Sequence, residues 1–282
     1  MPTVAEYVLL GTVRLTSGAH KDRARADAEL LLRHLLQKDR AWLITHGGDE
    51  IGSDHWEAYF ALLERRYHGA PIQYILGEAE FYGLRFRVTP DALIPRPETE
   101  HLVEHTIRLA TEFADPRIVD VGAGSGAIAV ALAVNLLNAH ITTIDVSPDA
   151  LELARENAVR NRVAERIRFL GGDLLEPVSG EQFDLIVSNP PYVPDADRAS
   201  LSVEVREYEP AQALFAGKDG LDVYRRLIPA AYTALAPGGY ILLEIGYGQP
   251  EGVRALLAAS GFEAVHFLPD LQGIPRVACG RR

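Results

Sequence analysis

The sequence has 282 residues, of which 48% are hydrophobic and 24% are charged. This length and composition predict an ordinary globular protein with room for one large domain and a small second one. The formal net charge of −11 disfavours nucleic acid as the main partner, because a negative field repels a phosphate backbone. A single cysteine, Cys279, excludes an internal disulfide and any multi-cysteine metal site.

Membrane and export signals are missing from the sequence pattern. No stretch reaches the roughly 18 apolar residues that a membrane-spanning helix needs. The opening residues, MPTVAEYVLL, lack the basic flank and the small-residue cleavage site of a signal peptide. We therefore expect a cytoplasmic protein with no membrane contact. We also expect a monomer, because no long exposed apolar stripe stands out.

Helical periodicity dominates the first 70 or so residues. Asp22–Gln37 carries a stripe of leucines, and Asp54–Tyr67 places several aromatic residues on one face. Ser53 or Asp54 is placed to cap the second of these helices. The aromatic residues predict the core of a small helical bundle rather than a ligand-binding box.

The pattern then changes to that of a short hairpin followed by a corner. Apolar and arginine residues alternate over 84–88, which predicts a half-buried strand, and Gly83 predicts the turn before it. Pro95-Arg96-Pro97 forces an extended backbone, and the acidic residues after it suit a helix N-terminus. We therefore predict three segments: residues 1–76 as a helical domain, 77–97 as a β-hairpin linker, and 98–282 as a second, larger domain.

Strand-like and helical segments alternate from about residue 116 onward. Predicted helices cover residues 127–138, 149–161 and 251–259. The predicted strands are Arg117–Val121, Ile141–Asp145, Ile167–Leu170, Phe183–Val187, Tyr240–Glu244, Phe262–Phe267 and Pro275–Cys279. This alternation predicts an α/β domain with a mostly parallel sheet.

A glycine-rich turn, Gly122-Ala123-Gly124-Ser125-Gly126, follows the first of these strands and leads into a helix of small residues. Glycines let the backbone bend sharply and let a ligand approach closely, and the N–H groups of a helix start favour a negative group. The turn fits a dinucleotide or S-adenosylmethionine equally well, and Asp145 suits the ribose of either. S-adenosylmethionine would place its methionine part against Gly122–Gly126 and its adenine near Asp173 and Leu174.

The segment Asn189-Pro190-Pro191-Tyr192 follows the fourth strand and so lies at the carboxyl edge of the sheet, where ligands bind in such folds. Two prolines fix the backbone, so the carbonyls of Asn189 and Pro190 can point at a ligand. With the Asn189 side-chain oxygen, they can accept both hydrogens of a planar NH₂ group, while Tyr192 offers a face for stacking. Acceptors placed out of the amide plane would favour a pyramidal nitrogen, whose lone pair can attack a methyl carbon without any metal.

With these residues, the chain resembles the peptide chain release factor N5-glutamine methyltransferases of the HemK type over nearly its whole length. Asn-Pro-Pro-Tyr alone is shared with enzymes that methylate base amino groups, and the segment from Pro71 to Glu100 makes the resemblance specific. The matching motifs are Pro71-Ile72-Gln73-Tyr74-Ile75 with Gly77, Phe81-x-Gly83, Leu93-Ile94-Pro95-Arg96-Pro97-Glu98-Thr99-Glu100, the glycine turn, Tyr208-Glu209-Pro210, Ala213-Leu214, Gly220-Leu221 and Tyr224-Arg225.

The resemblance implies a fold and a reaction. The fold is a seven-stranded, class I (Rossmann-like) S-adenosylmethionine-dependent methyltransferase domain, preceded by a small helical domain and a hairpin. The reaction methylates the glutamine of the Gly-Gly-Gln motif of release factors, which the helical domain would recognise. The implied cofactor site is Gly122, Ala123, Gly124, Ser125, Gly126, Asp145, Asp173, Leu174 and Asn189, and the implied glutamine site is Asn189, Pro190, Pro191 and Tyr192, with Asn189 and Tyr192 catalytic. Leu174 departs from the aromatic residue often found there in the family.

Four other functions compete with this interpretation. A methyltransferase acting on a base amino group would use the same acceptors, but it needs a basic surface or a recognition domain. A nicotinamide-dependent oxidoreductase would explain the glycine turn and leave Asn-Pro-Pro-Tyr without a task. His101-x-x-Glu104-His105 matches an inverted zinc-peptidase pattern, although an exposed helix face is the simpler interpretation. A non-catalytic binding protein would not need both the acceptor oxygens and the aromatic ring of the Asn-Pro-Pro-Tyr corner.

Overall fold

The computed structural model describes residues 1–52 and 54–282, and the chain forms two compact units. Met1–Gly77 and Leu201–Tyr208 form the helical unit, and Glu78–Ser200 and Glu209–Arg282 form the larger unit. The hairpin therefore groups with the larger unit, and a short segment from late in the chain groups with the helical one. Neither grouping is visible in the sequence pattern.

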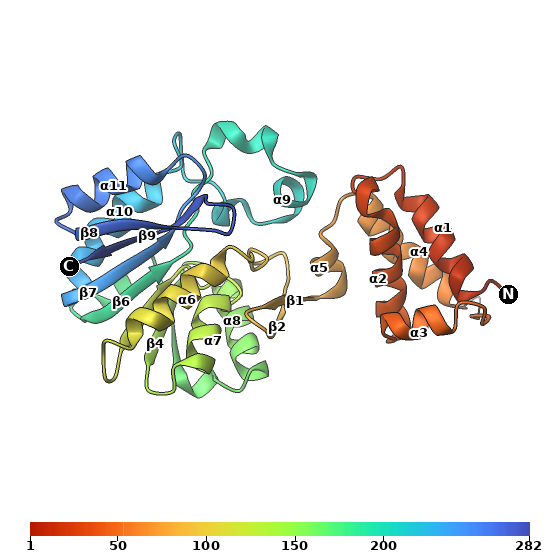
Figure 1. Cartoon of the computed structure of the whole chain (residues 1–282), viewed down its shortest axis with the longest axis horizontal. Helices are drawn as coiled ribbons and strands as arrows, with labels where there is room; N and C mark the ends of the chain where they lie inside the picture. Colours follow the sequence, from red (N-terminus) through yellow and green to blue (C-terminus); the bar gives the residue numbers. More distant parts are fainter. Residues whose placement is uncertain (53) are drawn as a thin grey trace. The chain divides into compact units, whose positions relative to one another are not determined.

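The helical unit packs its helices around a tyrosine-rich core (Figure 1). Tyr7 and Tyr59 are fully buried, with ring centroids 5.8 Å apart, so the aromatic face expected of Asp54–Tyr67 contributes to a bundle core. A capping box between Thr3 and Glu6 starts the first helix. The expected cap at Ser53 lies outside the described residues. The helices are α1 (Val4–Leu15), α2 (Ala24–Leu36), α3 (Arg40–Thr45), α4 (Asp54–Tyr67), α5 (Ile72–Leu76) and α9 (Val203–Tyr208).

A buried ion pair ties α9 to this unit. Arg66 is 2% exposed and donates to a carboxylate oxygen of Asp27, which is 1% exposed, at 2.6 Å. The same guanidinium donates to Ala70 O at 2.9 Å and to Glu204 of α9. The Tyr208 hydroxyl donates to the carbonyl oxygen of His68 at 3.1 Å. A segment far along the chain is therefore held on the helical unit by charge and hydrogen bonding.

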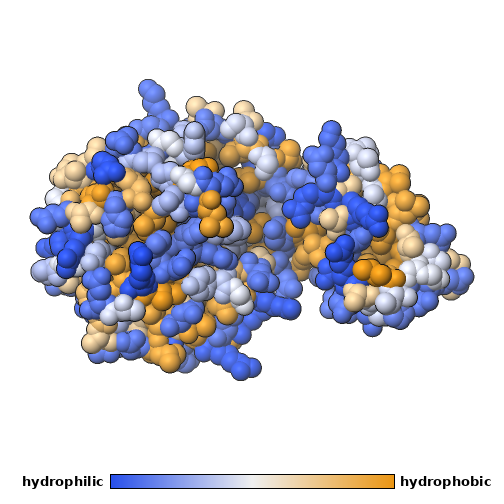
Figure 2. Space-filling model, viewed as in Figure 1, coloured by the Kyte–Doolittle hydropathy of each residue, from blue (hydrophilic) through white to orange (hydrophobic). Residues whose placement is uncertain are grey.

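Part of α1 is apolar and exposed. Leu9, Leu10 and Val13 are 61%, 46% and 64% exposed, and Figure 2 shows apolar surface over this helix. An exposed apolar face of this kind commonly marks a contact surface for another protein. We expected a monomer because the sequence showed no long exposed apolar stripe. The exposed apolar face of α1 removes the basis for that expectation.

The expected hairpin is present at the start of the larger unit. Strands β1 (Glu78–Phe81) and β2 (Leu84–Arg87) pair antiparallel. Tyr82 and Gly83 between them both have positive φ, of 52° and 71°, as a tight two-residue hairpin turn requires. The rings of Phe81 and Phe86 meet edge to face with centroids 6.0 Å apart, which fixes the hairpin against the core of this unit.

A seven-stranded sheet in the order β5-β4-β3-β6-β7-β9-β8 forms the centre of the larger unit, and its first five strands are parallel, as the alternation predicts. β9 runs antiparallel to both of its neighbours. The strands are β3 (Arg117–Val121), β4 (His140–Asp145), β5 (Ile167–Gly171), β6 (Phe183–Ser188), β7 (Leu235–Glu244), β8 (Glu263–Pro269) and β9 (Pro275–Arg281).

Helices cover both faces of the sheet (Figure 1). One apolar core forms under α6 (Thr99–Ala110), α7 (Ala127–Asn135) and α8 (Pro148–Arg160), and the other under α10 (Asp222–Ala234) and α11 (Pro250–Ala259). Short 3₁₀ turns occur at Lys21–Arg23, Ala164–Arg166, Glu176–Val178, Asp195–Ser200 and Ala211–Ala213. Strand order reverses at β3 and β6, which is where doubly wound sheets bind ligands. Among the described residues, no helix combines the length and apolarity that crossing a bilayer requires.

Candidate active site

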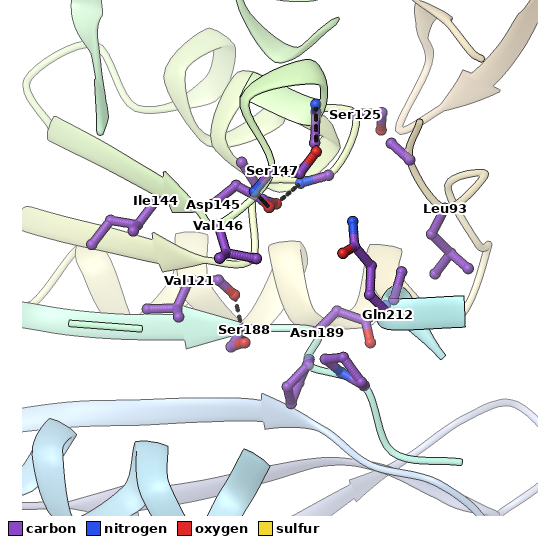
Figure 3. Close-up of a pocket in the computed structure, with 18 of the residues that line it drawn as sticks. Leu93, Val121, Ser125, Ile144, Asp145, Val146, Ser147, Ser188, Asn189 and Gln212 are labelled. Atoms are coloured by element: carbon purple, nitrogen blue, oxygen red, sulfur yellow. Dashed lines mark hydrogen bonds between the residues drawn. The ribbon is translucent and has the colours of Figure 1, made fainter. Parts of the chain in front are cut away.

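A cavity of about 310 Å³ opens where β3, β4 and β6 end (Figure 3). This volume lies at the small-ligand end of the usual range for binding sites. The glycine turn, the end of β4, residues 172–174 and the corner at 188–191 line it. Residues 91–96 and the 210–213 segment complete the wall, and the side chain of Gln212 projects into the space (Figure 3). The two motifs singled out in the sequence therefore share one site.

The glycine turn brings its backbone close to the Asn-Pro-Pro-Tyr corner. Gly122 and Gly124 have φ of 87° and 51°, a region where residues with a Cβ are strained. Gly122 N and Ala123 N both donate to Ile144 O, at 2.8 and 2.9 Å, which fixes the turn on β4. A Cβ placed on Gly122 would lie only 4.0 Å from Asn189 O. The turn and the corner are therefore adjoining parts of the cavity lining.

Gly126 has a different role from the other glycines. It does not line the cavity, although the sequence placed it in the cofactor site. Its φ is 79°, and a Cβ there would approach the Cα and Cβ of Ala154 at 3.0 Å. Gly126 is needed because the chain enters α7 in close contact with α8.

Asp145 stabilises the glycine turn as well as facing the cavity. Its carboxylate accepts from Gly124 N at 2.8 Å and from Ser147 N at 2.9 Å, as Figure 3 shows. A carboxylate has about four acceptor positions, so lone pairs remain for the hydroxyls of a ribose. Asp173 and Leu174 also line the cavity, and Asp173 pairs with Arg226 of α10.

Asn189 follows directly after the central strand β6, where the Asn-Pro-Pro-Tyr corner begins. Ser188 Oγ donates to Val121 O at 2.6 Å and joins the ends of β6 and β3 (Figure 3). Asn189, Pro190 and Pro191 line the cavity. The Asn189 NH₂ group donates to Thr99 Oγ1 at 3.0 Å. The strand end and this bond fix the residue from both sides.

Tyr192 lies outside the lining of the cavity. Its hydroxyl donates to Glu244 Oε1 at 3.3 Å, and its carbonyl oxygen accepts from Gln249 Nε2 at 2.9 Å. Burial is the main cause that raises the pKa of its phenol, so the ring stays neutral. The stacking role expected of Tyr192 remains a prediction.

Several residues of the site were given no role by the sequence analysis, although some of them lie in the motifs that carry the family resemblance. Thr99 lines the cavity beside the corner and bonds Glu244 behind it, and Arg96 bonds Glu209 at 2.5 Å where two cavity walls meet. Gln212 and Arg226 also line the cavity, and each lies next to a motif residue without being part of the motif. A useful signal would have been the charged end of the apolar strand Tyr240–Glu244, because a carboxylate at the edge of a buried strand needs partners.

The zinc-peptidase pattern at His101, Glu104 and His105 lies on α6. Across residues 1–52 and 54–282, no three His, Cys, Asp or Glu side chains gather closely enough to hold a metal ion. The pattern therefore lacks the third protein ligand that a zinc site requires. Burial and the nearby Arg108 lower the pKa of His105, which keeps that ring neutral.

Comparisons with known proteins agree with this arrangement. Residues 10–77 match the family model of the PrmC N-terminal domain, and residues 98–207 match that of the methyltransferase small domain. The release factor glutamine methyltransferase of Koribacter versatilis is 44% identical over 260 residues, which cover 92% of this chain and 91% of the relative. That of Deinococcus radiodurans is 43% identical over 271 residues, covering 96% and 95%.

A solved structure shows the same fold. The 16S rRNA methyltransferase of Thermus thermophilus, in complex with AdoMet and guanosine, superposes with a TM-score of 0.53 at 20% identity and covers 73% of this chain and 49% of that one. The sheet order, the helices on both faces and the cavity at the strand ends are those of a class I methyltransferase. With relatives above 40% identity over nearly all of its length, the chain belongs to the release factor glutamine methyltransferase family.

Proposed function

We propose that this protein transfers a methyl group from S-adenosylmethionine to the side-chain amide nitrogen of the glutamine in the Gly-Gly-Gln motif of a release factor, in the cytoplasm. One observation carries the proposal: the glycine turn and the Asn189 corner line a single cavity and adjoin each other, with a Cβ on Gly122 only 4.0 Å from Asn189 O. A cofactor on one wall and an amide on the other would be adjacent.

The residues on the glycine side fit the cofactor. Gly122 to Ser125 present backbone with little side-chain bulk for the methionine part, and Asp145 retains lone pairs for the ribose hydroxyls. Asp173 and Leu174 are assigned to the adenine, where Leu174 offers an apolar contact and no aromatic stacking. S-adenosylmethionine, when bound, supplies a methyl carbon made electrophilic by the sulfonium charge.

The residues on the corner side fit a primary amide. The Asn189 side-chain oxygen and the Asn189 and Pro190 carbonyls are acceptors, and a glutamine NH₂ group has two hydrogens to donate. Holding both hydrogens fixes the nitrogen and favours the pyramidal form that develops in the transition state. Positioning of this kind can contribute about 7–11 kcal/mol to a reaction between two bound groups. Tyr192 is assigned the flat contact with the amide plane.

The helical unit is suited to a protein partner. We assign residues 1–76 to recognition of the release factor, 77–97 to a linker and 98–282 to methyl transfer. The exposed apolar face of α1 at Leu9, Leu10 and Val13 supports this, because recognition of a folded protein needs apolar contact area. A net charge of −11 argues against a nucleic acid in this role.

The proposal is tested by incubating the purified chain with a full-length release factor and S-adenosylmethionine bearing a deuterated methyl group. Mass spectrometry should find one labelled methyl on the Gly-Gly-Gln glutamine. A release factor with glutamate in place of that glutamine is the substrate control. Methylation at another residue, or of an added oligonucleotide in place of the protein, would overturn the proposal.

Asn189→Ala tests the assigned acceptor. The loss of one acceptor for the transition state should lower kcat by roughly 10²–10³. The dissociation constant of S-adenosylhomocysteine, measured by calorimetry, should rise far less than kcat falls, because Asn189 is only one of the residues assigned to the cofactor, and the melting temperature should change little. Asn138→Ala is the matched control, because Asn138 is exposed and precedes β4 at the opposite edge of the sheet. Equal turnover of the two variants would refute the assignment of Asn189.

A further inference from the structure

A chain of hydrogen bonds lies directly behind the Asn189 corner. The Asn189 NH₂ group donates to Thr99 Oγ1 at 3.0 Å, and Thr99 Oγ1 donates to Glu244 Oε2 at 2.5 Å. The other carboxylate oxygen of Glu244 accepts from the Tyr192 hydroxyl at 3.3 Å. Thr99, at the wall of the cavity, is 4% exposed and Glu244 is 2% exposed, so the bond between these two residues is shielded from bulk water. One carboxylate thus reaches Tyr192 directly and Asn189 through a single hydroxyl.

Three separate elements meet in this chain of bonds. Thr99 is the first residue of α6, Glu244 is the last residue of β7, and Asn189 follows β6, which pairs with β7. Tyr224 of α10 adds a bond to the carbonyl oxygen of Glu244 at 2.7 Å, which holds the backbone of that residue in place. The carboxylate is therefore fixed by the sheet and by helices on both of its faces.

The polarity of the chain of bonds determines which end of the Asn189 amide points away from Thr99. A hydroxyl has one hydrogen, and an ionised carboxylate can only accept. While Glu244 is ionised, Thr99 must give its hydrogen to the carboxylate, so the Thr99 oxygen can only accept from Asn189. Only the NH₂ end of the amide can satisfy that oxygen. The carbonyl oxygen is then the end left to face the cavity that Asn189 lines.

The cost of burying Glu244 indicates that the residue has a task. Burial raises the pKa of Glu244 to about 7, against the hydrogen bonds from Thr99 and Tyr192, which favour the ionised form. The carboxylate has no ion pair among the described salt bridges, and the nearby Arg276 is bonded to Asp270 at 3.0 Å. An apolar side chain at the end of a buried strand would avoid this cost. A purely structural role does not account for a buried carboxyl that has hydrogen bonds but no ion pair.

We propose that Glu244, acting through Thr99, is a positioning residue that keeps the Asn189 carbonyl oxygen directed at the substrate amide. The inference rests on the proposed function for its chemistry, since it assumes that Asn189 accepts from the glutamine. Without the Thr99 hydroxyl, the Asn189 amide can rotate by 180° and present two donors to a group that itself donates. The site would keep its shape and its cofactor but lose its acceptor.

Thr99→Val, which removes the hydroxyl and keeps the volume, is the main test. It should lower kcat by about 10–100-fold, since misplacement of a reacting group can cost about 10². The dissociation constant of S-adenosylhomocysteine should stay within about twofold. Thr99→Ser, which restores the hydroxyl, should recover most of the activity. Thr106→Val is the matched control, because Thr106 is a buried threonine of the same helix whose hydroxyl donates to Leu102 O, at 2.7 Å, within that helix.

A spectroscopic measurement tests the orientation without turnover. The side-chain NH₂ resonances of Asn189, identified by their loss in Asn189→Ala, should be protected from exchange with solvent in the parent protein and in Thr106→Val. They should lose this protection in Thr99→Val. Glu244→Gln should act in the same direction, because a carboxamide can donate to Thr99 and so free the Thr99 hydrogen to bind the Asn189 oxygen.

The outcomes separate this inference from the proposed function. If the parent protein methylates the release factor and Thr99→Val is as active as Thr106→Val, the positioning role is wrong and the function stands. If the parent protein does not methylate the release factor, the function is wrong, and the NH₂ resonances still decide whether Thr99 orients Asn189. Should Thr99→Val fail to fold, the exchange protection of Asn189 in Glu244→Gln decides the matter, and unchanged protection overturns the inference.

Discussion

Replacing Asp120 by asparagine would measure how strongly a buried carboxyl beneath the glycine turn opposes folding. Asp120 is completely buried in β3, and its only described side-chain donor is Thr143 Oγ1 at 2.9 Å. Burial is the main cause that raises its pKa from 3.8 to about 7, and Asp145 adds to the rise. Asparagine has nearly the same shape and carries no titrating group, so it isolates the effect of the charge.

The expected magnitude follows from the shift. A pKa raised from 3.8 to about 7 corresponds to roughly 4 kcal/mol between the two protonation states. The folded chain binds this proton more tightly than the unfolded chain, so the stabilisation is complete below about pH 4 and is lost as pH rises to about 7. The free energy of unfolding of Asp120→Asn, relative to the parent protein, should therefore rise by roughly 4 kcal/mol across that window.

Urea unfolding followed by far-ultraviolet circular dichroism, at several pH values and without cofactor, is the assay. Both tryptophans, Trp42 and Trp56, lie in the helical unit, so their fluorescence reports on that unit and should show no pH-dependent difference between the proteins. Asp115→Asn is the control, because Asp115 is exposed just before the same strand. Parallel stability curves for Asp120→Asn and the parent protein from about pH 4 to 7.5 would refute the reasoning.

Two further substitutions test the packing of each unit. Asp27→Ala removes one of the two carboxylates that bind the buried guanidinium of Arg66, while Glu204 remains, so the helical unit should lose about 1–3 kcal/mol of stability, measured by tryptophan fluorescence in urea. A loss below about 1 kcal/mol would mean that this pair is effectively solvated. Gly126→Ala adds a Cβ at 3.0 Å from Ala154 in a backbone region with φ of 79°, so the turn must shift. Calorimetry should show weaker binding of S-adenosylhomocysteine, and unchanged affinity would mean that α7 and α8 can separate at no cost to the site.

The sheet was the most predictable part of the fold, because buried parallel strands are short apolar runs bounded by turns. All seven predicted strands are present, with ends that differ by one or two residues except in β7, which begins five residues before the predicted start. Helix α10 was not predicted, since Pro229 interrupts the pattern and removes one backbone donor from the middle of the helix. The attachment of α9 to the helical unit depends on the bond between Arg66 and Glu204. Contacts between residues so far apart in the chain leave no local pattern to read.

The residues expected to bind the cofactor could be placed at one cavity from the sequence, because each of them lies in a turn or at a strand end on the same edge of the sheet, and their role stays a prediction. Seven of the nine expected residues are Gly122 to Ser125, Asp145, Asp173 and Leu174, and all of these line the cavity. The eighth, Asn189, lines it too, whereas Gly126 is required for helix packing. The residues that support the corner come from α6 and β7, which meet β6 only in the folded sheet. Their roles follow from tertiary structure and could not be derived from spacing.

Under the proposed function, Asn-Pro-Pro-Tyr would supply only part of an amide-binding site. Two prolines fix the backbone after Asn189, but the last torsion of an asparagine side chain is soft, and its two ends differ only in whether they donate or accept. A site built on that side chain is selective for an NH₂ group only while the oxygen is held in place. The bond to Thr99 Oγ1 at 3.0 Å provides this restraint, and the 2.5 Å bond from Thr99 to Glu244 gives the restraint its direction. Asn189 supplies the acceptor oxygen. In the arrangement we propose, the carboxylate of Glu244 on the neighbouring strand β7 keeps that oxygen directed at the substrate.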